Sequence, residues 1–263
     1  PGEAPEMWNL TNPEKITRIH KEYYISGSDV VNTNTFGVNP LKYDDKTVEA
    51  MISAAFVCAD LARREAGGEK YIALDIGPTG RLLKPLGDLP FEEAVTAFAK
   101  VVSEGVKNGA DLIVIETMND SYETKAAVIA AKENSDLPII VTNVFDDSAK
   151  LMTGADIEAM VAMLEGLGVD ALGMNCSLGP VQMKRLVPDF MKNASIPVAV
   201  VPNAGLPRSE NGKTMFDVDA DEFSDIMADI ASQGVRIIGG CCGTTPEYIR
   251  KTAEKVKNIP IKE

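Results

Sequence analysis

Three cysteines stand at the ends of apolar stretches of the chain, where their thiols could share one metal ion. Cys241 and Cys242 are adjacent, have glycines on both sides and follow the run Val235–Gly239, while Cys176 closes the run Ala171–Cys176. Neighbouring residues of a regular strand point to opposite faces, so both thiols reach one ion only if the backbone bends there. Zinc binds thiolates tetrahedrally, and a catalytic zinc keeps one position open. The pattern predicts an open zinc site, with a vicinal disulfide or buried inert thiols as alternatives.

Two carboxylates and three smaller residues lie at the ends of other apolar runs. Asp75 and Glu116 stand inside such runs, where burying a bare carboxylate is costly. Asp75 could therefore hold a ligand's ammonium group, with satisfaction by backbone amides as the alternative. Glu116 is either a site residue or a partner in a buried ion pair. Asn203 and Thr35 offer hydrogen bonds to a ligand, with turn chemistry as the alternative. Gly77 would let a ligand approach the backbone or would permit a turn.

Histidine chemistry is not expected. His20 is the only histidine, and it falls in the middle of a predicted helix, away from the polar run ends, which argues against a catalytic dyad or triad. Cys58 lies in the helical stretch Ala54–Ala62 and is predicted to be a small buried hydrophobe. The segment Gly205–Thr214 only superficially matches a phosphate loop, because Pro207 stands where that motif needs glycine.

The residues above must be positioned by alternating strands and helices. Seven short apolar runs predict parallel strands buried on both faces: Val30–Phe36, Tyr71–Ile76, Leu112–Thr117, Ile139–Phe145, Ala171–Cys176, Val198–Val201 and Val235–Gly239. Helical segments with good stops lie between them. We expect an α/β fold, a (β/α)8 TIM barrel with its first strand missing, as a single domain over residues 1–263. Polar residues at the carboxyl ends of strands favour the barrel over the runner-up, an open doubly wound sheet.

Composition narrows the function classes. The 263 residues carry a net charge of −13 with no basic patch, so nucleic acid is a poor partner. No apolar run approaches the ~20 residues of a membrane span. The four cysteines stand in a long chain that shows no signal peptide, which argues against a disulfide scaffold and indicates a reducing cytoplasm.

The same residues resemble the homocysteine S-methyltransferase family, and are most similar to the homocysteine-binding domain of cobalamin-dependent methionine synthase. The segments that carry the resemblance follow family order along nearly the whole chain: Asn9–Pro13, Ile19–Tyr23, Thr33–Gly37, Asp75–Gly80, Glu116–Thr117, Asn175–Pro180, Asn203–Gly205 and Gly239–Glu247. The last segment, taken with Cys176, is the most specific.

The resemblance implies a (β/α)8 barrel in which zinc is held by three cysteines and the sulfur of homocysteine takes the open position. The residues that it places in the site are the metal ligands Cys176, Cys241 and Cys242, the catalytic and substrate-binding residues Asp75, Glu116 and Asn203, and the pocket-wall residues Thr35 and Gly77. The family's first strand carries an Asp-Gly-Ala-Met-Gly-Thr-like segment that helps to bind the substrate's carboxylate, and this chain starts after it. We therefore expect a barrel that lacks that strand.

The expected activity is zinc-dependent transfer of a methyl group to the thiol of homocysteine, giving methionine. The first choice of donor is methylcobalamin on a separate corrinoid protein or domain. S-methylmethionine, a betaine or another onium donor is the enzyme alternative. A non-catalytic zinc-binding barrel subunit and a thiol-redox protein that uses Cys241 and Cys242 are the alternatives from other classes.

Overall fold

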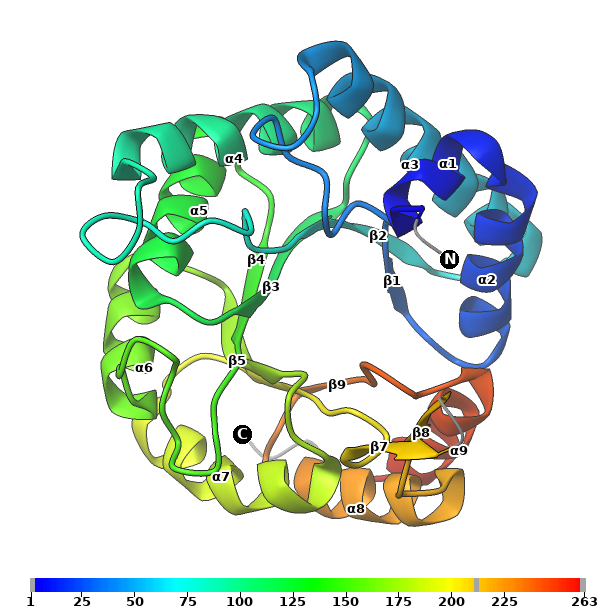
Figure 1. The fold of residues 1–263 in the computed structure, drawn as a ribbon. Helices are drawn as coiled ribbons and strands as arrows, with labels where there is room; N and C mark the ends of the chain where they lie inside the picture. Colours follow the sequence, from blue (N-terminus) through cyan, green and yellow to red (C-terminus); the bar gives the residue numbers. More distant parts are fainter. Residues whose placement is uncertain (1–2, 211–212, 261–263) are drawn as a thin grey trace. The chain divides into compact units, whose positions relative to one another are not determined.

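Alternating strands and helices build the whole described chain (Figure 1). The computed structural model describes residues 3–210 and 213–260. The chain divides into two compact units, Pro1–Ile140 and Val141–Glu263. Each unit has its own set of parallel strands and its own buried apolar residues.

Three parallel strands in sequence order form the sheet of the first unit. Strand β1 pairs with β2, and β2 with β3, with Val30 opposite Tyr71 and Ala73 opposite Leu112. The elements are η1 (Pro5–Met7), α1 (Trp8–Thr11), α2 (Pro13–Ile25), β1 (Val30–Asn32), α3 (Asp45–Ala66), β2 (Tyr71–Ile76), α4 (Phe91–Lys107), β3 (Leu112–Met118) and α5 (Ser121–Asn134). Strand β2 is buried over all but its first residue, as expected for a parallel strand covered on both faces.

Local chemistry explains where these helices begin and how closely they pack. The side chains of Asp44 and Asp120 accept hydrogen bonds from backbone N–H groups in the first turns of α3 and α5, which is the usual N-cap arrangement. Helix α4 lies close on β2 at Gly105, where a Cβ atom would stand only 2.4 Å from Cδ2 of Leu74. Only glycine fits that contact without a shift of the Leu74 side chain.

The second unit repeats the strand–helix pattern and adds a small hairpin. Strand β4 (Ile139–Asn143) runs through the boundary between the units. The remaining elements are α6 (Ile157–Gly166), β5 (Ala171–Asn175), α7 (Pro180–Asn193), β6 (Val198–Val201), β7 (Pro207–Glu210), β8 (Lys213–Phe216), α8 (Ala220–Ser232), β9 (Ile237–Ile238) and α9 (Pro246–Val256). Strands β5, β6 and β9 are parallel neighbours, and β7 pairs with β8 antiparallel.

Each of the seven predicted strands is present, but several end earlier than predicted. Strand β1 stops at Asn32 because the chain then turns, with Thr35 N donating to Thr33 O. Strand β9 covers only Ile237–Ile238 before the glycines that lead to the cysteines. The β7–β8 hairpin was not predicted. It lies within the segment rejected as a phosphate loop, and short polar strands of this kind give no apolar run.

The described residues ahead of β1 form helices and turns and no strand, in keeping with the expected absence of a first strand. His20 lies within α2, as predicted, and its side chain is buried. Cys58 is buried in α3, as predicted. Burial lowers the pKa of His20 to about 4, so the imidazole is neutral at pH 7. Among the described residues, no helix is long and apolar enough to cross a membrane. The single-domain assignment of residues 1–263 stays a prediction.

Candidate active site

The three cysteines beyond the strand ends come together within the second unit. Cys176 follows β5, and Cys241 and Cys242 follow β9. The sulfur of Cys242 lies 3.9 Å from that of Cys176 and 3.9 Å from that of Cys241. All three sulfurs lie within 4.8 Å of one another, and the cysteines are reduced. The predicted convergence of the three thiols is therefore confirmed.

These distances match the spacing that one tetrahedral metal ion needs. A zinc–sulfur bond of about 2.3 Å places two sulfurs of a tetrahedral site about 3.8 Å apart. Two of the sulfur pairs are already at 3.9 Å, whereas a disulfide requires about 2.05 Å. The cluster could therefore hold a metal ion without rearrangement of the backbone.

Backbone hydrogen bonds fix the peptide units that carry the cysteines. Cys176 N donates to Val201 O at 3.1 Å, and Cys241 N donates to Pro202 O at 2.8 Å. Both acceptors lie at the end of β6, so the strand between β5 and β9 holds both cysteine loops. The thiol positions are thus set by sheet geometry and not by the flexibility of a loop.

Asn203 ties the cysteines to one another. Its side chain is 4% exposed, and its Oδ1 accepts a hydrogen bond of 3.1 Å from the backbone N–H of Cys242. A further hydrogen bond joins the Asn203 side chain to the thiol of Cys176. Asn203 therefore contacts two of the three predicted ligands. Residues that hold metal ligands in this way strongly influence metal affinity.

The backbone at and beside the cysteines has positive φ angles, which are uncommon for residues other than glycine. Cys176 and Ser177 have φ values of 56° and 60°, in the left-handed region that costs a non-glycine residue free energy. Gly243, at φ 82°, follows Cys242, and a Cβ atom there would stand 2.2 Å from the ring of Phe216 in β8. Strain that the surrounding structure maintains is typical of functional sites.

The thiols share hydrogen bonds that shift their acidity. The hydrogen bond from Cys241 is the main cause that lowers the pKa of Cys176 from 9.0 to about 6. Burial, followed by the charge of Cys176, raises the pKa of Cys242. One thiolate is therefore favoured at neutral pH even before any metal binds, and the thiolate is the form that binds metal.

A pair of carboxyl groups occupies the ends of β2 and β3 in the first unit. Asp75 is 5% exposed and is hydrogen-bonded to Glu116, while its Oδ1 is buried without a hydrogen-bond partner. Burial, and then the charge of Glu116, raises the pKa of Asp75 well above its usual range. Backbone amides do not satisfy Oδ1. A buried Asp75 with an unpaired oxygen, beside the half-buried Glu116, is suited to a cationic group such as an ammonium ion.

Two buried threonine hydroxyls hold the backbone of Asp75. Asp75 N donates to Thr33 Oγ1 at 3.2 Å, and Thr35 Oγ1 donates to Asp75 O at 2.7 Å. The two hydroxyls are also 2.8 Å apart and hydrogen-bonded to each other. Thr35 thus supports Asp75 from inside the protein. Thr33 was not singled out from the sequence, although its position in the same Asn/Thr run was the available signal.

Gly77 and Thr117 shape the loops next to the carboxyl pair. Gly77 N donates to Phe36 O at 3.1 Å, and a Cβ atom at Gly77 would stand 2.6 Å from the Phe36 ring. Thr117, directly after Glu116, has a φ of 60°. Backbone strain therefore accompanies Glu116 as it accompanies Cys176.

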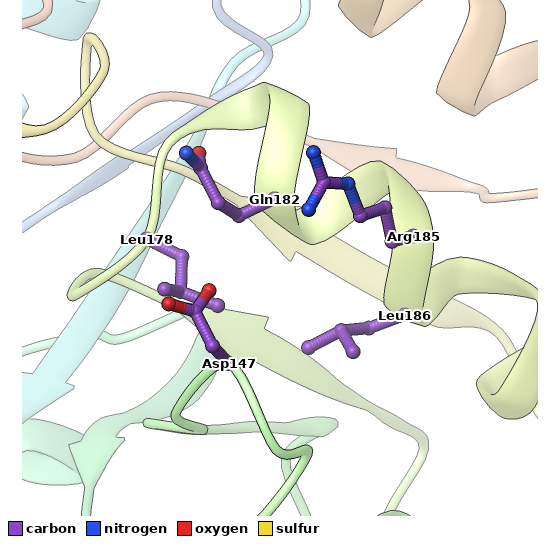
Figure 2. A pocket seen from close by; sticks show the side chains of 5 residues that line it. All are labelled: Asp147, Leu178, Gln182, Arg185 and Leu186. Atoms are coloured by element: carbon purple, nitrogen blue, oxygen red, sulfur yellow. The ribbon is translucent and has the colours of Figure 1, made fainter.

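A separate hollow of about 290 Å³ lies in the second unit beside the loop that follows Cys176. Figure 2 shows the side chains of Gln182 and Arg185 on α7 above it, with Asp147 and Leu178 on its other side. Leu186 completes the lining, which includes none of the predicted site residues. Leu178 O accepts a hydrogen bond of 3.0 Å from Asn203 N, so the hollow borders the cysteine loops without containing them.

Comparison with known proteins identifies the family. A family model described as homocysteine S-methyltransferase matches residues 3–256. Methionine synthase of Mycobacterium leprae (strain TN) is 32% identical over 95% of this chain, and methionine synthase of Mycobacterium tuberculosis (strain ATCC 25618 / H37Rv) is 33% identical over 97% of it. This chain spans 22% of the length of each of these relatives.

A solved structure agrees with the fold. The metallated form of the homocysteine methyltransferase MmuM from Escherichia coli matches with a TM-score of 0.81 and 24% identity, over 97% of this chain and 90% of that one. A likeness at this level of identity bears on the fold alone, and it confirms the predicted α/β barrel class.

Proposed function

Since this chain belongs to the homocysteine S-methyltransferase family, we propose that it transfers a methyl group to the thiol of homocysteine, giving methionine, with zinc held by Cys176, Cys241 and Cys242. The observation that carries the proposal is the spacing of the three sulfurs, at distances that suit one tetrahedral ion. Three thiolates leave the fourth position for the substrate sulfur.

The cysteine cluster suits thiol activation. When bound, zinc supplies Lewis acidity that favours the deprotonated form of a thiol substrate at neutral pH. Cys176, Cys241 and Cys242 act as its ligands, and Asn203 holds Cys242 through the backbone N–H and Cys176 through the thiol. A free thiol has a pKa of about 8.5, so without such help little homocysteine would be nucleophilic.

Asp75 and Glu116 are proposed to bind the ammonium group of homocysteine. Oδ1 of Asp75 is buried and lacks a hydrogen-bond partner, and an ammonium group donates three hydrogen bonds. Two carboxyl groups joined by a hydrogen bond hold one proton between them at the pH where Asp75 is neutral. A bound ammonium would replace that proton and stabilise both groups as carboxylates.

The substrate sulfur then forms a bond to the methyl carbon while the carbon's bond to its donor breaks, and that electron pair stays with the donor. The proton of the thiol would be released to the solvent when homocysteine binds, so no histidine base is needed. This agrees with the position of His20, which is buried in α2. Thr35 and Gly77 are proposed to support the pocket wall next to Asp75.

Methylcobalamin on a corrinoid protein or domain is the proposed donor. The similarity to two methionine synthases supports it, and the 22% share of their length leaves room there for further domains that could present the donor. An onium compound such as S-methylmethionine or a betaine is the second candidate. A reducing compartment such as the cytoplasm is proposed, because the three thiols must stay reduced to bind metal.

A product assay tests the activity and separates the donors. The zinc-loaded chain is incubated with homocysteine and either methylcobalamin, S-methylmethionine or glycine betaine, and methionine is quantified. Methionine from methylcobalamin supports the proposal, and methionine from an onium donor alone moves the assignment to the second candidate. No methionine with any donor, together with bound zinc, would leave a non-catalytic zinc-binding barrel. Reversible loss of two thiols without bound metal would favour a thiol-redox protein.

A variant pair tests the assigned roles. Glu116→Ala should weaken homocysteine binding and leave zinc content intact, because Glu116 lies in the carboxyl pair and not among the cysteines. Glu133→Ala, at an exposed position on α5, is the control and should change neither. Loss of zinc from Glu116→Ala would contradict the role given to Glu116.

A further inference from the structure

Glu123 is a buried carboxylate of the first unit that lies outside the roles described so far. Glu123 stands in the first turn of α5 and is 3% exposed. Its Oε1 accepts two hydrogen bonds from one residue, at 2.8 Å from Thr79 N and at 2.6 Å from Thr79 Oγ1. Thr79 is itself buried, so both ends of the contact are shielded from water.

The direction of this contact is not the one that helix capping favours. Glu123 is the third residue after the N-cap Asp120, where a glutamate usually reaches back to the N-cap N–H in a capping box. The two hydrogen bonds to Glu123 come instead from a loop that is 44 positions away in the sequence. The side chain therefore links separate parts of the unit and does more than begin its own helix.

The loop that Glu123 holds adjoins the carboxyl pair. Thr79 belongs to Gly77–Gly80, which directly follows Asp75 and Ile76 in β2. Glu123 lies in the first turn of α5, the helix that follows β3, and β3 carries Glu116. The Glu123–Thr79 contact therefore joins the chain segment after Asp75 to the chain segment after Glu116.

Further contacts hold the Gly77–Gly80 loop and the start of α5 in place. Thr79 Oγ1 also accepts a hydrogen bond of 3.2 Å from Arg81 N, which closes the turn. The ring of Phe91 at the start of α4 stacks on Tyr122, the neighbour of Glu123, with 4.5 Å between ring centroids. Burial raises the pKa of Glu123, while the hydrogen bonds from Thr79 act against this shift and favour the charged form.

We propose that Glu123 is a positioning residue of the homocysteine pocket, which sets the separation of Asp75 and Glu116 by clamping the Gly77–Gly80 loop to the start of α5. The inference rests on the proposed function, because that function assigns Asp75 and Glu116 to the ammonium group of the substrate. Glu123 does not touch the substrate and acts through Thr79.

The test compares variants of both partners by calorimetric titration of the zinc-loaded chain with homocysteine. Glu123→Ala removes both hydrogen bonds, and Thr79→Val removes only the one from the hydroxyl. Misplacement of reacting or binding groups by about 1 Å can cost about 100-fold, so we expect the Kd to rise at least about 10-fold in Glu123→Ala and less in Thr79→Val. Glu133→Ala, exposed on the same helix, is the matched control.

A purely structural role would give a different result. Partial unfolding would lower the number of binding sites per chain and leave the Kd of the folded molecules unchanged, whereas loss of positioning raises the Kd at full occupancy with zinc content intact. Thr79→Ser keeps the hydroxyl and should restore the parent Kd. The effects of Thr79→Val and Glu123→Ala on the Kd should be less than additive, because both changes remove the hydrogen bond between Thr79 Oγ1 and Glu123. The loss of the Arg81 N contact is specific to Thr79→Val.

The outcomes separate this inference from the proposed function. If the zinc-loaded parent binds homocysteine and Glu123→Ala binds it with the same Kd, the positioning role is wrong and the proposed function stands. If the zinc-loaded parent binds no homocysteine, the proposed function fails and the role of Glu123 in that pocket fails with it. If Glu123→Ala does not fold, the comparison of the homocysteine Kd between Thr79→Val and Thr79→Ser decides the matter. An equal Kd in those two variants would overturn the inference.

Discussion

Replacing Asp75 by asparagine should weaken ligand binding and stabilise the free protein at the same time. Asparagine keeps the shape of the side chain and can still hydrogen-bond Glu116, but it carries no charge at any pH. The carboxyl that it replaces is 5% exposed, with Oδ1 unpartnered. A charge-assisted hydrogen bond is worth about 1.5–3 kcal/mol, so losing the bond to the ammonium group should raise the Kd of homocysteine by roughly 10- to 150-fold.

The effect on stability has the opposite sign and depends on pH. The folded-state pKa of Asp75 is raised, chiefly by burial and next by Glu116. The stability of the parent is therefore highest below the unfolded-state pKa of about 3.9 and is lost as pH rises through the folded-state pKa. The asparagine of the variant does not titrate. The variant should gain on the parent by up to about 1.4 kcal/mol for each pH unit in that window.

Urea unfolding of zinc-loaded parent and Asp75→Asn at pH 5, 6, 7 and 8 measures this difference, in which the contributions of the cysteines cancel. Asp136→Asn, at an exposed position before β4, is the control and should show no such trend. A stability difference that stays flat or shrinks as pH rises would refute the account of the buried carboxyl. An unchanged Kd for homocysteine would refute its role in binding.

Three further predictions follow from the same contacts. Cys241→Ser should bind far less than one zinc per chain, measured by metal analysis after dialysis, because one of three thiolate ligands is gone; full zinc content would contradict the assigned ligands. Asn203→Ala should release zinc to a chelator about 10- to 100-fold faster, because the hydrogen bond to Cys242 N is lost, whereas an unchanged rate would deny Asn203 that role. Gly105→Val should destabilise the chain by about 1–3 kcal/mol in urea unfolding, since α4 meets Leu74 there; an unaffected midpoint would show that the contact can relax.

The strands and the cysteine cluster could be predicted because their signals lie in short stretches of sequence or in residues of a distinctive type. Parallel strands buried on both faces leave unbroken apolar runs, as in Ile113–Ile115 before Glu116. Cys176, Cys241 and Cys242 each follow such a run, so the shared edge of parallel strands brings their sulfurs together. Neighbouring residues likewise predict a helical position for His20 and a buried helical position for Cys58, and both side chains are buried.

Contacts between distant segments could not be predicted. The β7–β8 hairpin has no apolar run, and its Phe216 ring finds Gly243 only in the folded chain. Glu123 has the sequence signature of a helix N-terminus. Nothing in the sequence shows that Thr79, 44 positions earlier, donates hydrogen bonds to its carboxylate. The unpartnered oxygen of Asp75 likewise depends on which groups the fold leaves out of reach.

The central claim is that three cysteines hold a zinc ion at which homocysteine binds. The most direct test is calorimetric titration of homocysteine into the chain loaded with one equivalent of zinc and into the same chain stripped of metal, with buffers of different ionisation enthalpy to count released protons. We predict binding to the zinc form with release of the thiol proton, and also of the proton shared by Asp75 and Glu116 at a pH where Asp75 is neutral. Binding to the stripped form should be at least about 100-fold weaker. Equal binding to both forms, or a chain that takes up no zinc under reducing conditions, would contradict the account.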